Sequence, residues 1–160
     1  MLVFLPSTRT VAERLREGSG TPAPQVGYAA TAGLRRAHGL GPAETEEAEY
    51  TALAYAGAAA LVAAEEPVRL VLAAEVAEDR LTGGPRPDLG EVVVSGLGWG
   101  DVVALFLDDR DSRAAVARAR AAVAGQALVD AVETEPVRAL LEEVDLLWYD
   151  PAELDHLPLG

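Results

Sequence analysis

The stretch VRLVLAAEV, residues 68–76, decides the fold, because it is a nearly continuous apolar run that follows Pro67. A short apolar run bounded by proline predicts a strand that is buried on both faces. Further apolar runs occur at Met1–Leu5, Val26–Ala30, Glu91–Ser95, Val102–Leu107 and Leu146–Tyr149. Strands of this kind need a helical layer on each side, so we expect a sheet sandwiched between helices.

Helical segments are expected between most of these strands. The longest covers about 43–65 and begins after Gly41-Pro42, where proline and several glutamates suit the start of a helix. Within it, residues recur at helical spacing: Tyr50, Leu53, Gly57, Leu61 and Ala64. This stripe, rich in alanine and glycine, predicts close packing on the sheet. Other helices are predicted at 8–17, 34–38, 112–124, 134–143 and from Asp150 onward, and 77–90, rich in Gly and Pro, as a surface loop.

Strands and helices alternate along most of the chain, which favours the α/β class. We expect one domain over residues 1–160. It should contain a mixed, partly parallel sheet of about five or six strands with helices on both faces.

The charge balance restricts the possible partners. The chain has 13 arginines, no lysine and 26 acidic residues, for a net charge of −13. Phosphate backbones and anionic lipids attract cationic surfaces, so nucleic acid and membrane binding are disfavoured. A protein partner or a small molecule remains possible. The acidic run Glu44, Glu46, Glu47 and Glu49 suits a solvated helix start and also recognition of a basic partner.

The composition also bears on compartment and assembly. The chain has no cysteine, which removes disulfides and thiol chemistry. Met1–Pro6 is too short for a signal peptide, and no apolar run approaches the ~18 residues of a membrane span. We therefore expect a cytoplasmic protein. Its oligomeric state stays open, although the alanine-rich helix could pack against a second copy.

The strongest candidate for a ligand site follows the strand at 102–107. Asp108, Asp109 and Asp111 lie where open α/β sheets place their ligands, and Ser7 and Thr8 end the first strand. Asp109 and Asp111 resemble the magnesium-binding aspartate pair of haloacid dehalogenase-type phosphatases. That family also needs a lysine or arginine and further carboxylates later in the chain, and its pair normally follows the first strand. This chain departs from that pattern, because it has no lysine and its pair comes late. The alternative is that these aspartates end a strand and cap a helix.

The other motifs form no complete catalytic centre. The glycine-rich segment 96–100 lacks the spacing of a dinucleotide fingerprint, and it lacks the lysine of a phosphate loop. His38 and His156 are the only histidines, and Ser95 lies in no nucleophile motif. We expect no catalytic residue, no metal ligand and no cofactor.

Three aromatic residues are candidates for partner contacts: Trp99, Trp148 and Tyr149. Adjacent residues of a strand point to opposite faces, so one of Trp148 and Tyr149 should enter the core. The other should lie on a surface, where it can anchor a partner. Packing alone also accounts for these side chains.

Several of these segments together resemble a known family. They are MLVFLPST at residue 1, TEEAEYTAL at 45, VRLVLAAEV at 68, ALFLDD at 104 and LLWYDPAEL at 146. In this order they are similar to an uncharacterised actinobacterial family known only as a domain of unknown function. The resemblance spans nearly the whole chain. It implies an actinobacterial cytosolic origin and brings no activity or catalytic residue.

Three functions remain in view. The first is a non-enzymatic binding or regulatory module, which the acidic surface and the lack of a catalytic constellation favour. The second is a small-molecule or metal-dependent enzyme. Its site would combine the carboxylates that follow the strand at 102–107 with the hydroxyls of Ser7 and Thr8. The third is a structural homo-oligomer.

Overall fold

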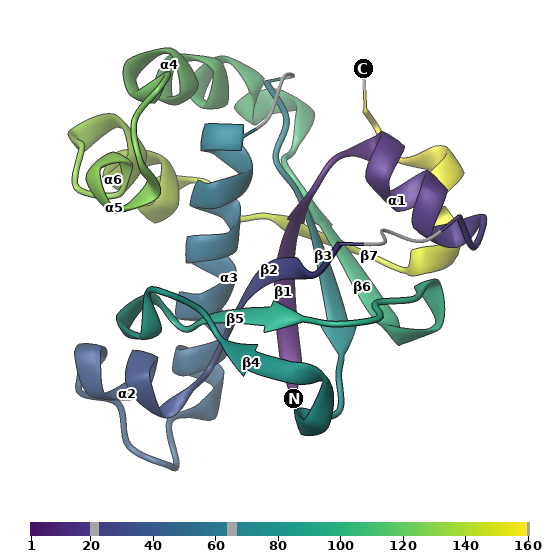
Figure 1. Ribbon diagram of the computed structural model, residues 1–160. Helices are drawn as coiled ribbons and strands as arrows, with labels where there is room; N and C mark the ends of the chain where they lie inside the picture. Colours follow the sequence, from purple (N-terminus) through teal and green to yellow (C-terminus); the bar gives the residue numbers. More distant parts are fainter. Residues whose placement is uncertain (20–22, 64–66, 160) are drawn as a thin grey trace.

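The computed structural model describes residues 1–19, 23–63 and 67–159. Its centre is a seven-stranded sheet of order β4-β5-β2-β1-β3-β6-β7, in which all neighbouring strands run antiparallel (Figure 1). The strands are β1 Leu2–Ser7, β2 Gln25–Ala29, β3 Leu70–Glu75, β4 Leu81–Gly83, β5 Glu91–Val94, β6 Val102–Leu107 and β7 Leu147–Tyr149. The expected partly parallel sheet of fewer strands is therefore wrong in both respects.

The expectation of parallel strands was wrong because an apolar run indicates that a strand is buried but does not indicate its direction relative to its neighbours. β3 is buried along Leu70–Ala74, since both of its faces are covered. It nevertheless pairs antiparallel with β1 on one side and with β6 on the other. An antiparallel strand covered on both faces has the same apolar composition as a parallel one.

The unexpected seventh strand, β4, lies within the segment 77–90 that was predicted to be a loop. Leu81 and Thr82 pair with Val94 and Val93 of β5 at one edge of the sheet. β4 has three residues and ends at Gly83. A strand this short shows no clear alternation of apolar and polar residues, so its sequence is typical of a turn.

Helices cover both faces of the sheet (Figure 1). We call the two sides the α3 face and the α1 face. The α3 face carries α2 (Ala32–His38) and α3 (Thr45–Ala63). The α1 face carries α1 (Arg9–Arg16) and the 3₁₀ helix η5 (Pro151–His156).

α3 approaches the sheet closely through small side chains, as expected. Ala48, Ala52, Ala56 and Ala60 are buried against Phe4 and other residues of the α3 face. The spacing of four residues places these alanines on one side of the helix. Their small size brings the backbone of α3 near the strands. The predicted end of this helix, about Glu65, lies outside the described residues.

Three further helices form a separate layer at one end of α3 (Figure 1). They are α4 (Arg113–Val123), α5 (Leu128–Ala131) and α6 (Glu135–Glu143). Their apolar residues pack on Ala58 and Leu61 of α3. α3 is thus buried on two sides. The shorter 3₁₀ helices are η1 Glu78–Arg80, η2 Pro87–Leu89, η3 Trp99–Asp101 and η4 Arg110–Ser112.

Helix starts follow the expected capping chemistry. The hydroxyl of Thr8 accepts a hydrogen bond from the backbone N–H of Val11 at 3.3 Å and begins α1. Asp150 and Glu153 form a reciprocal capping box at the start of η5, and the backbone N–H of Asp150 donates to the Glu153 carboxylate at 2.7 Å. These caps fix where the chain leaves the ends of β1 and β7.

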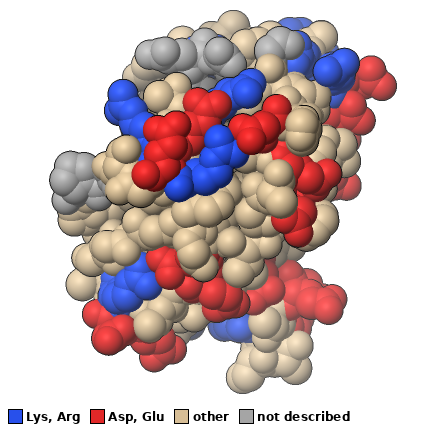
Figure 2. All heavy atoms as spheres, turned by 90° about the vertical axis from the view of Figure 1, so that its right-hand side faces the viewer, with Lys and Arg blue, Asp and Glu red and all other residues tan. Residues whose placement is uncertain are grey.

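The surface mixes charges of both signs. On the face shown in Figure 2, basic side chains lie directly beside acidic ones, and more of the surface is acidic than basic. Arg16 pairs with Asp155 at 2.9 Å, and Arg9 with Glu13 at 2.8 Å. The net negative charge is therefore dispersed on this face. Within the described residues, no helix combines the length and apolar character needed to cross a membrane.

Candidate functional site

The α3 face is covered unevenly, and a groove lies where the cover stops. α3 packs on β1, β2 and β3, and the groove opens beside it over β6 and β7. It has a volume of about 420 Å³. We call it the α3–β7 groove. Its lining residues are Leu2, Phe4, Glu46, Glu49, Tyr50, Leu53, Ala73, Val103, Ala104, Phe106 and Trp148.

A β-bulge in β6 supplies part of the groove floor. Ala73 lies opposite Ala104 and Ala74 opposite Val102, so Val103 has no partner on β3. An extra residue in one strand shifts the alternation of side chains beyond it. Val102 therefore packs in the core of the α1 face, while Val103 lines the groove and is 45% exposed. The bulge adds an apolar side chain to the groove.

Aromatic side chains continue the floor across the sheet. The ring of Phe4 meets that of Phe106 edge to face, with centroids 6.1 Å apart. Phe106 in turn lies opposite Trp148 in the register of β6 and β7. Trp148 is 59% exposed, which is unusual for so large an apolar side chain. The apolar row on the α3 face thus extends as far as β7, the strand at the edge of the sheet.

One side of α3 forms the groove wall. Glu46, Glu49, Tyr50 and Leu53 follow the i, i+3, i+4, i+7 spacing of residues on one helix face. Tyr50 is 56% exposed. Glu46 and Glu49 are the charged residues of the described lining, so the groove is apolar with a negative rim.

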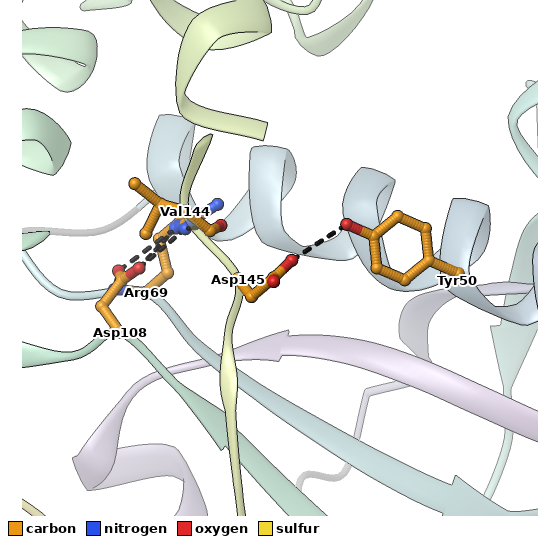
Figure 3. A network of polar contacts seen from close by, with 5 residues as sticks. All are labelled: Tyr50, Arg69, Asp108, Val144 and Asp145. Carbon is orange, nitrogen blue, oxygen red and sulfur yellow. Dashed lines mark hydrogen bonds and ion pairs between the residues drawn. The ribbon is translucent and has the colours of Figure 1, made fainter. Parts of the chain in front are cut away.

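The groove has a polar end at Tyr50. Its hydroxyl donates a hydrogen bond to Oδ1 of Asp145 at 3.0 Å, as Figure 3 shows. This hydrogen bond, together with burial and the charge of Asp145, raises the pKa of Tyr50 above its ordinary value. Tyr50 also borders a small hollow of about 30 Å³ that is lined by Arg69, Asp145 and others. That volume suits about one water molecule.

Arg69 and Asp108 form a buried ion pair behind this hollow (Figure 3). Nη2 of Arg69 donates to Oδ1 of Asp108 at 2.7 Å, and Nε lies 3.1 Å from both carboxylate oxygens. The backbone N–H of Arg69 donates to Oδ2 at 2.7 Å. Both side chains are almost wholly buried. Gly57 of α3 lies above the guanidinium, where an added Cβ would come within 3.4 Å of Nη1.

The residues predicted for a carboxylate site lie at one end of the sheet but do not meet. Ser7, Leu70 and Leu107 form one row across β1, β3 and β6. β3 therefore separates Ser7 from Asp108 by two strand spacings, on the order of 10 Å. The carboxylate of Asp108 is occupied by Arg69.

The other members of that predicted site have local roles. Asp109 accepts a hydrogen bond from the backbone N–H of Asp111 at 3.3 Å and begins η4, and both side chains are exposed. Ser7 donates to the carbonyl oxygen of Thr8 at 3.2 Å. Ser7 and Thr8 border a separate hollow of about 170 Å³ beside α1. Within the described residues, no cluster of His, Cys, Asp or Glu side chains could hold a metal ion.

The predicted aromatic contacts are divided between the two faces. Trp148 lines the groove, while Tyr149 packs against the core of the α1 face, as strand geometry predicts. Trp99 also packs against that core, at the start of η3. Of these three residues, Trp148 alone borders the described groove.

Several groove residues were missed from the sequence. Tyr50 was assigned to the stripe that packs on the sheet, because its spacing is the same as that of core residues, but it is exposed in the groove. Leu53 of the same stripe does pack against the core and also lines the groove. Nothing in the apolar run 102–107 marks the bulge at Val103. The ion pair did leave a signal: Arg69 interrupts one apolar run and Asp108 follows another, and opposite charges next to buried strands predict a pair.

Comparisons with known proteins give a family and nothing more specific. A search of curated proteins and a search of solved structures each found no match. A family model, described as a family of unknown function (DUF6912), matches residues 1–157. This agrees with the resemblance of the sequence segments to a domain of unknown function. The chain therefore belongs to the DUF6912 family.

Proposed function

We propose that the protein is a non-enzymatic binding module whose α3–β7 groove takes an apolar segment of a partner protein that carries arginine or lysine side chains. One observation carries the proposal. The groove holds three large, exposed apolar side chains, Tyr50, Val103 and Trp148, within a lining whose charged residues are both glutamates.

The apolar floor supplies the affinity in this proposal. Exposed apolar side chains gathered in one hollow are typical of an interaction site, whereas scattered ones are ordinary. Burial of apolar area contributes about 25 cal/mol per Å². Tryptophan and tyrosine are also the residue types that most often dominate binding energy at interfaces. Trp148 and Tyr50 stand on opposite sides of the groove, on β7 and α3.

The charge of the rim selects the partner. Glu46 and Glu49 lie at the start of α3, and the whole chain carries a net charge of −13. A cationic segment would be attracted from a distance and held at the rim, and salt would weaken that attraction. Nucleic acids and anionic lipids would be repelled.

The two other functions gain no support from the geometry. A metal enzyme built on Asp108, Asp109 and Asp111 would need the Asp108 carboxylate, whose oxygens already bind Arg69. A homo-oligomer built on the alanine-rich helix would need small residues that are buried against the protein's own sheet. The α3–β7 groove, by contrast, is an open apolar surface of the described residues.

The probes that test this proposal are two short peptides of the same composition, made only of leucine and arginine. In one, the two residues alternate. In the other, leucines recur at helical spacing. Calorimetric titration should give binding of at least one peptide, weakened by salt. A control peptide with aspartate in place of arginine should not bind. Absence of binding by both leucine–arginine peptides would contradict the proposal.

A matched pair of variants tests whether the peptide binds in the groove. Val103 and Val26 are almost equally exposed, at 45% and 44%, but only Val103 is among the groove residues. Val103→Lys should weaken binding by about tenfold or more, ~1.4 kcal/mol, because it removes apolar contact and repels arginine. Val26→Lys adds the same charge elsewhere and should lose far less. Equal losses in the two variants would mean that binding is merely electrostatic.

A charge-matched pair of variants tests the rim. Glu46→Gln combined with Glu49→Gln should reduce both the affinity and its dependence on salt. Glu17→Gln combined with Glu142→Gln removes the same charge from exposed sites outside the groove. This second pair should leave the salt dependence close to that of the unaltered protein.

A further inference from the structure

We infer that the partner segment binds in an extended conformation, as an eighth strand beside β7. This inference rests on the proposed function, because it states how the groove would be filled. β7 pairs with β6, and its other edge pairs with no strand of the described residues.

The β7 edge is short, at three residues, which is one way in which sheet edges are protected, but within the strand it lacks the other protective features. Leu147, Trp148 and Tyr149 carry no charge, and Leu147 and Trp148 are exposed. Natural edge strands are usually blunted by charged residues, proline or a bulge. The opposite edge differs, because β4 ends in Thr82 and Gly83, which offer no large apolar side chain. The apolar edge therefore coincides with the groove.

The register of the sheet shows what a strand beside β7 would meet. Val71, Phe106 and Trp148 lie opposite one another on β3, β6 and β7. Val71 and Phe106 are packed on the α3 face, and Trp148 ends the row in the groove. A further strand would lie about 4.8 Å beyond β7. Every second side chain of it would extend this row and cover Trp148.

Backbone groups complete the interaction. In an antiparallel pair, alternate N–H and C=O groups of an edge strand point away from its neighbour. An added strand would satisfy these groups of β7, while its alternate side chains enter the groove. A helix in the same groove would bury apolar area but leave the β7 edge unpaired. The extended conformation therefore uses both features of this surface.

Charges at the ends of β7 favour a basic partner over a second copy of the chain. Asp145 precedes β7, Asp150 follows it, and both are exposed. If two copies paired through β7 around Trp148, Asp145 of one copy would lie near Asp150 of the other at each end. In that register Asp145 is opposite Pro151 and Asp150 is opposite Leu146, so no two carboxylates are directly opposed, but the four carboxylates gathered at the ends of the paired segment would still repel one another. Arginine or lysine near the ends of a partner segment would instead meet opposite charges.

The test uses the alternating leucine–arginine peptide and two N-methylated forms of it. One form is methylated at the leucine amides and the other at the arginine amides, so each blocks one edge of the extended peptide. Strand addition predicts that one form loses about tenfold or more in affinity for the full-length protein, while the other retains most of it. It also predicts that hydrogen exchange at Leu147–Tyr149 slows on binding.

Each other outcome has a distinct meaning. If the helical-spacing peptide binds more tightly and methylation has no effect, the extended conformation is wrong while the binding function stands. If neither unmethylated peptide binds, the proposed function fails and this inference fails with it. Light scattering of the protein alone gives the last outcome. A dimer that Val103→Lys dissociates and Val26→Lys does not would show that a second copy occupies the groove, which overturns the inferred partner.

Discussion

Arg69 and Asp108, 39 residues apart in the chain, form an ion pair that is almost completely removed from solvent. The pair joins the residue before β3 to the residue after β6. It therefore connects two neighbouring strands at one end of the sheet. Arg69 also lies under α3, so the ion pair contacts the helix layer as well as the sheet.

Breaking this pair should strongly destabilise the fold. Asp108→Ala leaves a buried guanidinium without its counter-ion, and we expect a loss of about 3–5 kcal/mol in the free energy of unfolding. Replacing both partners with apolar residues, Arg69→Met and Asp108→Leu, should cost much less than the single change. Urea unfolding followed by circular dichroism measures both. Asp88→Asn, which breaks the exposed pair with Arg86, is the control and should change little. A double variant as unstable as Asp108→Ala would contradict this account.

The Arg80–Asp101 pair should make stability depend on acid pH. Nη2 of Arg80 lies 2.7 Å from Oδ2 of Asp101. The hydrogen bond from Arg80 is the main cause that lowers the pKa of Asp101 below its ordinary 3.8, against the opposing effect of burial. Because the folded-state pKa of Asp101 is lowered, the ion pair contributes its full stabilisation of the fold above pH 3.8. This stabilisation is lost as the pH falls below 3.8 through the folded-state pKa.

Asp101→Asn should therefore be less stable than the unaltered protein at neutral pH, and the difference should shrink as the pH falls below 3.8. Urea unfolding at a series of pH values provides the measurement. A difference that stays constant down to the most acid condition would refute the assignment.

A side chain at Gly27 should destabilise the fold. A Cβ at this position of β2 would come within 2.5 Å of Cγ1 of Val3 and 3.1 Å of the carbonyl oxygen of Phe4. Gly27→Ala should cost about 1–3 kcal/mol through overpacking between β2 and β1. Gly100→Ala is the matched control, because a Cβ there meets no atom within 4 Å. Comparable losses in thermal stability for the two variants would disprove the steric explanation.

Trp148 should matter for binding far more than for folding. It is exposed on the edge strand, whereas Leu105, on the neighbouring β6, is fully buried. Trp148→Ala should lower the free energy of unfolding by no more than about 1 kcal/mol. Leu105→Ala should lower it by about 2–5 kcal/mol, because it leaves a cavity. A large loss of stability in Trp148→Ala would place this residue in the core.

The sequence predicted the elements better than their arrangement. Apolar runs such as 102–107 and caps such as Asp150 are local signals, and the corresponding strand and helix start lie where they were expected. Direction and order depend on which strands meet. The paired residues of β1 and β3 are 63 to 73 positions apart in the chain, a separation that no local pattern reports. β4 has too few residues to show an alternation of apolar and polar side chains.

The candidate site was the least predictable part. The pair Trp148 and Tyr149 was identified, because adjacent residues of a strand face opposite ways, but the sequence did not indicate which of the two would line the groove. Tyr50 was placed in the core, because helical spacing gives a stripe but not where the sheet beneath it ends. Val103 could not be identified at all, since a bulge arises from the pairing of β6 with β3 and leaves no mark in an all-apolar run.

β1 stands in the middle of the sheet although it is the first strand of the chain. On one side it pairs with β3, and the amino group of Met1 donates to the carbonyl oxygen of Val76 at 2.8 Å. A newly made chain must therefore keep this apolar strand unpaired on that side until β3 has emerged from the ribosome. Such distant contacts slow folding, because the entropy of closing a long loop is lost before the contacts form. The interval before β3 arrives is when the chain is most exposed to aggregation and to chaperones.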